Sequence, residues 1–396
     1  MLRAFLLSIL LAILLQGISL SAIAASGDTF SPYVFASMTH DSNLLRLDQS
    51  ASSTNTSDSV RQMGVGMNVD WKVARQQILL TAAINDTRFA RYSILNYRGR
   101  DLQGRWNWQL DNHISGDLGC TDNLTIGSFA NQQVLVSNLR SQERCFYDGQ
   151  WLFHPSWQVG IGSSKSKISF SDIIQRILNS ENDVWETTLQ YLSSASTKVG
   201  VKLRETNGHY PNQAVDFISM LDNGYHQREI LATVDWNYSG HSMLQGQAGQ
   251  VQRKNDHFSI RDYNGITARG TYTWLPTDKV RLGVSAWREI WAWDDLTTSY
   301  SLNRGMSLEP SWTATSKITV SGKIQHEKHD FLGDPGILVL TTNRKDTSDT
   351  RVLSVSYQPT RSYSFSVSVG DDNRDSNLPL LSFRSETVSI SATFQM

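Results

Sequence analysis

Apolar and polar residues alternate one by one over long parts of this chain. From Met63 to Trp71 every second residue is apolar, the polar residues 72–76 follow, and the alternation resumes from Ile78 to Ile84. Side chains of a β-strand point alternately to opposite faces of the sheet. A period of two on both sides of a short polar stretch therefore predicts a β-hairpin.

The same hairpin pattern occurs eight times, and each copy has an aromatic residue just before its short turn. These aromatics are Trp71, Trp108, Trp151, Tyr191, Trp236, Trp274, Trp312 and Tyr357, at intervals of 37 to 45 residues. One more strand, around Tyr33, precedes the first hairpin, and another, around Ile390, follows the last. The pattern thus predicts about 18 strands, an even number, as is typical of bacterial outer-membrane barrels.

The connections between the predicted strands alternate in length. Those after the aromatics are short, whereas residues 41–59, 121–137, 207–224 and 333–349 form long polar connections. This favours an all-β, transmembrane, antiparallel up-and-down β-barrel with short periplasmic turns and long extracellular loops. The eight aromatics would then form a girdle at the periplasmic lipid–water interface. A second, outer girdle is expected from Trp185, Trp287, Trp291, Trp293 and Tyr300.

Other all-β folds explain the pattern less well. A β-propeller also repeats about every forty residues with a recurring Trp. However, a propeller fits four short strands into each repeat, whereas each repeat here holds two strands of about ten residues, enough to span a bilayer when tilted. A soluble sandwich or solenoid does not account for the aromatics at the turns.

The N-terminus predicts secretion. Arg3 precedes an apolar run over residues 4–15, and Ala22 and Ala24 provide small residues at a cleavage spacing, which is typical of a signal peptide. An uncleaved anchor is the alternative, but Gln16 and Gly17 interrupt the run before the roughly 20 residues that a span requires. We therefore assign residues 1–24 to a signal peptide and residues 25–396 to a barrel in the bacterial outer membrane.

Charged residues that alternate with the apolar face are predicted to line the lumen. The principal candidates are Asp101, Arg105, Arg144, Asp148, Lys202, Arg204, Arg269 and Arg281, with Asp117, Glu186, Lys198, Glu229, Asp235, Glu309 and Lys323 as further ones. A barrel of this size leaves an aqueous interior unless it is plugged. A strongly ion-selective pore would carry one sign of charge, so this mixed lining suits neutral or weakly charged hydroxylated solutes. Ordinary ion pairs across the wall are the alternative.

Little in the chain suggests other chemistry. The net charge of −1 gives no reason to expect a nucleic-acid partner. Ser164 and Lys167 match an S-x-x-K pattern, but the companion motifs of that acyl-enzyme chemistry are absent. His326 and His329 are three residues apart, which places them on opposite faces of a strand. We therefore predict no enzyme, with no catalytic, cofactor-binding or metal-binding residues.

The two cysteines, Cys120 and Cys145, are expected on neighbouring strands and on the lipid-facing side. Two separate thiols are the simpler interpretation. A disulfide between the strands is the alternative, because the periplasm is oxidising.

Several segments resemble one known family. They are Pro32-Tyr33-Val34, the D-x-N-L-F-R-like run of residues 41–46 with Leu45 in place of Phe, NVDWKVARQQ at residues 68–77, NDTRF at residues 85–89 and GRDLQGRWNW at residues 99–108. They resemble the EpsL-type exopolysaccharide biosynthesis proteins, outer-membrane β-barrel porins associated with exosortase/PEP-CTERM systems. The resemblance implies a role in exopolysaccharide biosynthesis or export, with outer-membrane lipid, extracellular polysaccharide and other export components as partners. The alternative function is a general diffusion porin for small polar solutes.

Overall fold

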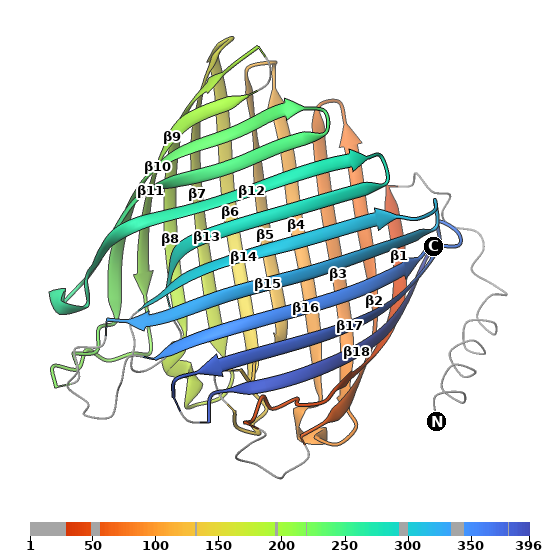
Figure 1. Ribbon diagram of the computed structural model, residues 1–396. Coiled ribbons are helices and arrows are strands. Elements are labelled where there is room, and N and C mark those ends of the chain that lie inside the picture. The colour runs from red at the N-terminus through yellow and green to blue at the C-terminus, as the bar shows by residue number, and fades with distance from the viewer. Residues whose placement is uncertain are drawn as a thin grey trace.

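The computed structural model describes residues 29–48, 56–130, 133–194, 197–218, 220–292, 300–333, 344–378 and 380–396. Within them, eighteen strands form one antiparallel sheet in which each strand pairs with its neighbours in the chain. The sheet closes on itself because β1 (Phe30–Asp41) also pairs with β18 (Phe383–Gln395) (Figure 1). The predicted 18-stranded antiparallel barrel is therefore confirmed. The predicted signal peptide and Trp293 lie outside the described residues.

The other strands follow in chain order around the barrel. They are β2 (Asp58–Val73), β3 (Gln76–Phe89), β4 (Tyr97–Leu110), β5 (Ile114–Ile126), β6 (Leu139–His154), β7 (Trp157–Phe170), β8 (Ser180–Leu192), β9 (Lys198–His209), β10 (Gly224–Ser239), β11 (Ser242–Asn255), β12 (Tyr263–Thr277), β13 (Val280–Ala292), β14 (Tyr300–Thr313), β15 (Ile318–Leu332), β16 (Lys345–Tyr357) and β17 (Tyr363–Ser376). Three 3₁₀ turns, η1 (Ser93–Leu95), η2 (Gln175–Leu178) and η3 (Ser259–Arg261), lie in connections. None of the helices in the described ranges has the length and hydrophobicity to cross a membrane.

Two ends of the barrel can be distinguished by the bounds of the strands. At the turn end, only Ala74 and Arg75 separate β2 from β3, whereas at the loop end residues 42–57 separate β1 from β2. Ala74 and Asp111 have positive φ angles of 53° and 59° in their turns. Such left-handed conformations match the twist of tight hairpins.

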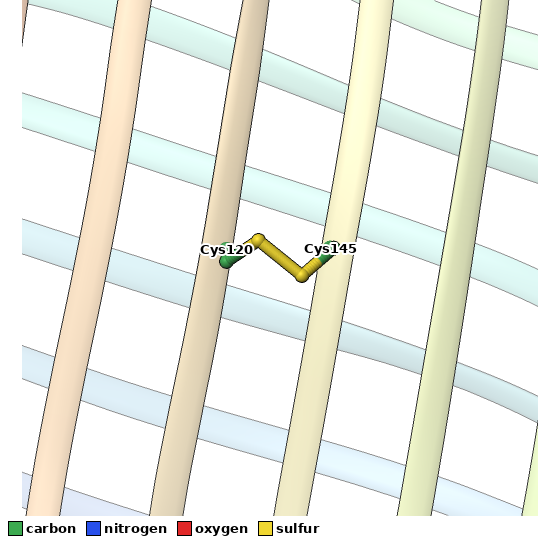
Figure 2. The surroundings of a disulfide bond; sticks show 2 residues. All are labelled: Cys120 and Cys145. Atoms are coloured by element: carbon green, nitrogen blue, oxygen red, sulfur yellow. A yellow bond between two sulfur atoms is a disulfide. The ribbon is translucent and has the colours of Figure 1, made fainter.

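The apolar side chains form the outer face of the barrel. On β2, Met63, Val65 and Met67 are 42–53% exposed, and Val65 pairs with Val34 and Ile84 on the neighbouring strands. Figure 2 views the wall from outside: the bridge between Cys120 and Cys145, which belong to this apolar face, lies in front of β5 and β6. The alternate residues of each strand form the inner face.

The eight aromatics before the turns all lie on the outer face. Each sits no more than three residues before the end of its strand. Seven of them are 44–53% exposed, namely Trp71, Trp151, Tyr191, Trp236, Trp274, Trp312 and Tyr357. Trp108 instead covers Gly116 and stacks on Tyr147, with ring centroids 6.4 Å apart. Their position at a membrane interface stays a prediction.

Candidate functional site

The inner face of the barrel wall is the candidate site. The register places all eight principal candidates there, since each alternates with the exposed apolar side chains of its strand. They do not converge on one point. They are Asp101 and Arg105 on β4, Arg144 and Asp148 on β6, Lys202 and Arg204 on β9, Arg269 on β12 and Arg281 on β13. That they line an open lumen stays a prediction.

Arg204 is the centre of the densest ion-pair cluster on this face. Its guanidinium contacts Glu186 of β8 at 2.5 Å and Glu229 of β10 at 3.2 Å. Lys202 contacts the same Glu186 at 3.5 Å, and Gln227 donates a hydrogen bond to Glu229 at 2.8 Å. Only 9% of the Glu229 side chain is exposed. One arginine therefore bridges two carboxylates on the strands at either side of it, and Lys202 supplies the second positive charge.

A second cluster surrounds Trp287 of β13. Arg269 pairs with Glu289 at 2.7 Å and lies over the Trp287 ring, 5.0 Å from its centroid. The indole Nε1 donates to Glu327 of β15 at 2.9 Å, and the ring passes over Gly305 of the intervening β14. Trp287 is thus on the inner face, and its expected place in an outer aromatic girdle was wrong. Trp185 does lie on the outer face, 59% exposed.

Glu289 and Glu327 were missed by sequence reasoning. Around Trp287 the chain reads AWREIWAW, which is apolar at both even and odd positions. Alternation therefore gave no signal for which residues faced inward at this level. Glu289 is eight residues after Arg281 on the same strand, so both side chains point to the same face. Extending the prediction for Arg281 along the strand could therefore have identified Glu289 as an inward residue.

We call the inner-face ionisable residues of these clusters, with the Arg105–Asp117 pair and the neighbouring Asp148 of β6, the charged arc. Its members are Arg105, Asp117, Asp148, Glu186, Lys202, Arg204, Glu229, Arg269, Glu289 and Glu327. Arg105 contacts Asp117 at 2.6 Å across β4 and β5. Four cations and six carboxylates are present, so this arc carries both signs of charge.

On four adjacent strands the inner face is rich in hydroxyl groups, and we call this set of hydroxyl residues the hydroxyl arc. Its members are Ser37, Thr39, Ser354, Ser356, Ser364, Ser366, Ser368, Thr387, Ser389, Ser391 and Thr393 on β1, β16, β17 and β18. Ser366 and Ser391 are hydrogen-bonded at 2.7 Å, and Thr39 and Ser389 at 2.8 Å. A hydroxyl can donate and accept, so this arc can bind polyols without selecting for charge.

The loop end of the inner face is packed by arginines and aromatic rings. Arg344 pairs with Asp346 at 2.5 Å and lies 4.3 Å from the Phe331 ring centroid. Arg374 also approaches Asp346, at 3.9 Å, and lies over Phe383. Arg344, Asp346 and Phe331 are all buried. Side chains therefore fill this part of the interior.

The residues of the D-x-N-x-x-R run have a structural role that is visible in the fold. Asp41 accepts hydrogen bonds from the Asn43 amide at 2.8 Å and Ser385 at 2.6 Å, and it forms an ion pair with Arg46 at 2.8 Å. The fully buried Asn43 donates to the backbone of Leu47 and of β18. The run thus fastens the first long loop to the seam where β1 meets β18.

A pair of long loops is joined through Asp222. Its carboxylate accepts hydrogen bonds from the His257 ring at 2.9 Å, the His257 amide at 2.7 Å and the Phe258 amide at 3.1 Å. Burial raises the pKa of Asp222, but these hydrogen bonds outweigh it and hold the pKa below its ordinary value. Asp222 therefore fastens residues 210–223 to residues 256–262.

The other residues considered for chemistry lie apart. Ser164 is on the inner face of β7, whereas Lys167 is on the outer face and pairs with Glu181 at 3.0 Å. His326 contacts Asp349 outside, and His329 contacts Asn303 inside. In the described part of the chain no group of three His, Cys, Asp or Glu residues could hold a metal.

The cysteines differ from the expected pair of separate thiols. Cys120 and Cys145 form a disulfide on the outer face, with their Cα atoms 4.0 Å apart (Figure 2). They are directly opposite in the register of β5 and β6, which brings the two side chains together. Their position on neighbouring strands and on the apolar side is as expected.

Comparison with known proteins gives a likeness of fold. No family model and no curated protein matches the chain. Among solved structures, OccK5 (OpdH) of Pseudomonas aeruginosa has a TM-score of 0.50 and 10% identity, over 93% of this chain and 98% of that one. OccK2 (OpdF) of the same organism has a TM-score of 0.50 and 9% identity, with the same coverage. The chain thus shares the barrel fold of these proteins.

Proposed function

We propose that this protein is an outer-membrane channel through which small, neutral or weakly charged polar solutes diffuse. The observation that carries this proposal is the hydroxyl arc, which lies beside an arc of mixed charge in which most charged groups are paired. Such a wall offers hydrogen bonds to a solute without a ring of one charge sign to select ions. The closed 18-stranded barrel and the apolar outer face support its placement in a membrane, with the short turns in the periplasm.

A single introduced cysteine can test the channel directly. The only two native cysteines are joined to each other, so a new thiol is the one reactive group. Ser391→Cys places it on the inner face of the hydroxyl arc, and the matched Ser163→Cys places it on the outer face between Tyr147 and Trp185. The assay is uptake of neutral sugars by proteoliposomes before and after a bulky, water-soluble thiol reagent.

The proposal expects sugar uptake by the unmodified protein and strong inhibition of Ser391→Cys after labelling. Ser163→Cys should remain unlabelled in the bilayer, and its uptake should not change. Proteoliposomes without sugar uptake, or uptake that labelled Ser391→Cys fully retains, would contradict a channel lined by the hydroxyl arc.

A role in exopolysaccharide export is a second proposal, and it rests on the resemblance at residues 68–77 and 99–108. The two proposals make different predictions for a gene deletion. Loss of surface polysaccharide, restored by the wild-type gene, would support the export role. Normal polysaccharide combined with lower uptake of small solutes would exclude it and support diffusion.

A further inference from the structure

Three neighbouring strands carry an unusual set of cations on their outer face. From the turn end upward, the outward residues of β13 and β14 are apolar up to Ala286 and Met306, and Arg288 and Arg304 come next. On β15 the apolar series ends at Ile324, and His326 and Lys328 follow. The cations therefore stand just beyond an apolar band of four outward residues per strand, which is close to the height of the band that faces lipid in such barrels.

Arg288, Arg304 and Lys328 lie directly opposite one another in the strand register, and we call them the basic triad. Arg288 pairs with Arg304 across β13 and β14, and Arg304 pairs with Lys328 across β14 and β15. Like charges at directly opposite positions destabilise a sheet. Three cations in such a row indicate that a negatively charged group offsets their repulsion.

The protein itself supplies little of that negative charge. Asp330 contacts Arg304 at 3.0 Å. Arg288 donates to the backbone oxygen of Ile266, and within the described ranges the exposed Lys328 forms no ion pair. One carboxylate therefore stands against three cations.

Several other cations on the outer face have acidic partners. Lys165 contacts Asp183 at 3.6 Å and Lys167 contacts Glu181 at 3.0 Å. On β10, Arg228 contacts Glu205 at 3.0 Å. The row of three directly opposed cations is thus a local feature of β13–β15.

Strand pairing between β12 and β13 also ends beside the basic triad. The β12–β13 ladder ends at Ala268 and Arg288, and beyond it residues 263–267 and 289–292 form no pairs with each other. Figure 1 shows the two strands diverging toward the loop end. Backbone groups without partners are costly in hydrocarbon, so this level belongs in the polar headgroup layer of a membrane.

We infer that the basic triad binds the phosphate of an outer-leaflet glycolipid. This inference rests on the proposed membrane placement, with the loop end outward. A phosphate monoester carries a charge of about −1.5 to −2 at neutral pH and has three acceptor oxygens. It supplies the charge and the hydrogen-bond acceptors that Asp330 alone does not. The acyl chains of such a lipid lie along the apolar band below Met306 and Ile324.

The test uses the full-length protein in detergent, with phosphorylated lipid A as the probe and native mass spectrometry to measure binding. The triad variant is Arg304→Gln/Lys328→Gln, which leaves Arg288 and its backbone hydrogen bond in place. The matched control is Lys165→Gln/Arg228→Gln, which removes the same charge from paired sites on the same outer face. Retention of the folded, heat-modifiable form in gels shows that each variant is a barrel.

Affinity for phosphorylated lipid A should fall on the order of tenfold to a hundredfold in the triad variant, because two charge-assisted contacts are lost. The affinity of the control variant should stay within about twofold of wild type, since the lipid phosphate makes no contact with the two residues changed there. Dephosphorylated lipid A should bind wild type and triad variant equally weakly.

Three results would overturn the inference. They are unchanged affinity in the triad variant, an equal loss in the control, and equal competition by inorganic phosphate or phosphatidylglycerol, which would indicate a free anion or an inner-leaflet lipid. The sugar-uptake assay separates this inference from the proposed channel. Triad variants should keep wild-type uptake, and a protein that binds lipid A but passes no sugar would contradict the channel alone.

Discussion

The charged arc and the hydroxyl arc belong to one wall and follow the same strand register, yet they are built differently. In the charged arc, side chains are held by partners on neighbouring strands, as Arg204 is by Glu186 and Glu229. In the hydroxyl arc, short side chains such as Ser366 and Ser391 make single neutral hydrogen bonds. The comparison separates two tasks: the charged arc stabilises the wall, and the hydroxyl arc leaves groups available to a solute.

This difference predicts an order of effects. Removing one member of a buried ion-pair cluster leaves a charge without compensation, which costs several kcal/mol in typical proteins. Removing one neutral hydroxyl costs about 1 kcal/mol. Substitutions in the charged arc should therefore affect stability most, and substitutions in the hydroxyl arc should affect mainly the passage of solutes.

The largest effect is expected for Arg204→Gln. It removes the guanidinium that lies between Glu186 and the nearly buried Glu229, and the remaining cation, Lys202, contacts Glu186 alone. We expect the free energy of unfolding to fall by about 3 kcal/mol, measured by urea titration in lipid vesicles. The matched control is Arg105→Gln. The Arg105 side chain in its ion pair with Asp117 is half exposed, and exposed pairs contribute about 1 kcal/mol or less.

Equal losses of stability in Arg204→Gln and Arg105→Gln would contradict this prediction. They would mean that the burial of an ion pair in the charged arc does not determine how much it stabilises the wall. A stable Arg204→Gln variant with altered ion selectivity would point to a different role. In that case the arginine would act on passing ions rather than on the wall.

The barrel could be predicted because one face of each strand contacts lipid and the other contacts water, so apolar and polar residues alternate along the strand. Where β2 reads Met63, Val65, Met67 between polar residues, only one assignment of faces buries the apolar side chains in lipid. The strand count and the turns followed from the repeat of such segments. The disulfide was left open because it depends on Cys120 and Cys145 being directly opposite, and a register shift of one residue would have separated them.

The division of the inner wall into two arcs could not be predicted. Sequence identifies inward residues strand by strand, but it does not show which inward residues are partners. Trp287 reaches Glu327 across an intervening strand only because Gly305 leaves room for its ring. That contact joins residues 40 positions apart, and no local pattern encodes it.

A second prediction compares one glycine from each arc. A Cβ at Gly305 would collide with the Trp287 ring, whereas a Cβ at Gly370 would meet the hydroxyl of Thr387 at 2.6 Å. An aromatic ring must move as a whole and would lose its bond to Glu327, but a hydroxyl can rotate away. We expect Gly305→Ala to cost about 1–3 kcal/mol and Gly370→Ala clearly less. Urea titration measures both, and tryptophan fluorescence should change only in Gly305→Ala.

Equal costs at the two glycines would show that the hydroxyl arc is as tightly packed as the charged arc. The Gly270→Ala variant sets the baseline, since nothing lies within 4 Å of a Cβ at that position.

A third prediction measures the hydroxyl arc by itself. Ser391→Ala removes the hydrogen bond to Ser366 and should cost about 0.5–1.5 kcal/mol. The double variant Ser366→Ala/Ser391→Ala should cost little more, because it leaves no hydroxyl without its partner. A strongly additive double-mutant cycle would contradict this pairing. Sugar uptake should decrease further in the double variant, since two groups available to solute are lost.

The smallest expected effect lies outside both arcs, at the loop contact of Asp222. Its pKa is lowered in the folded protein, so the contact contributes stability above the unfolded value of about 3.9. That contribution is lost as the pH falls through the lower, folded pKa. The protection factors of the His257 and Phe258 amides, which donate to Asp222, should therefore fall under acid conditions once the pH dependence of intrinsic exchange is divided out.

The Asp222→Asn variant shows whether an effect of acid on solute uptake comes from the long loops or from the barrel wall. The variant should protect these two amides less at neutral pH, and their protection factors should not fall further in acid. An acid response of solute uptake that persists in Asp222→Asn must come from another titratable group, and the carboxylates of the charged arc, such as Glu186 and Glu229, then become the first to test. An acid response that disappears in Asp222→Asn would instead assign control of uptake to the long loops, and the hydroxyl arc would no longer be the part of the molecule that sets what passes.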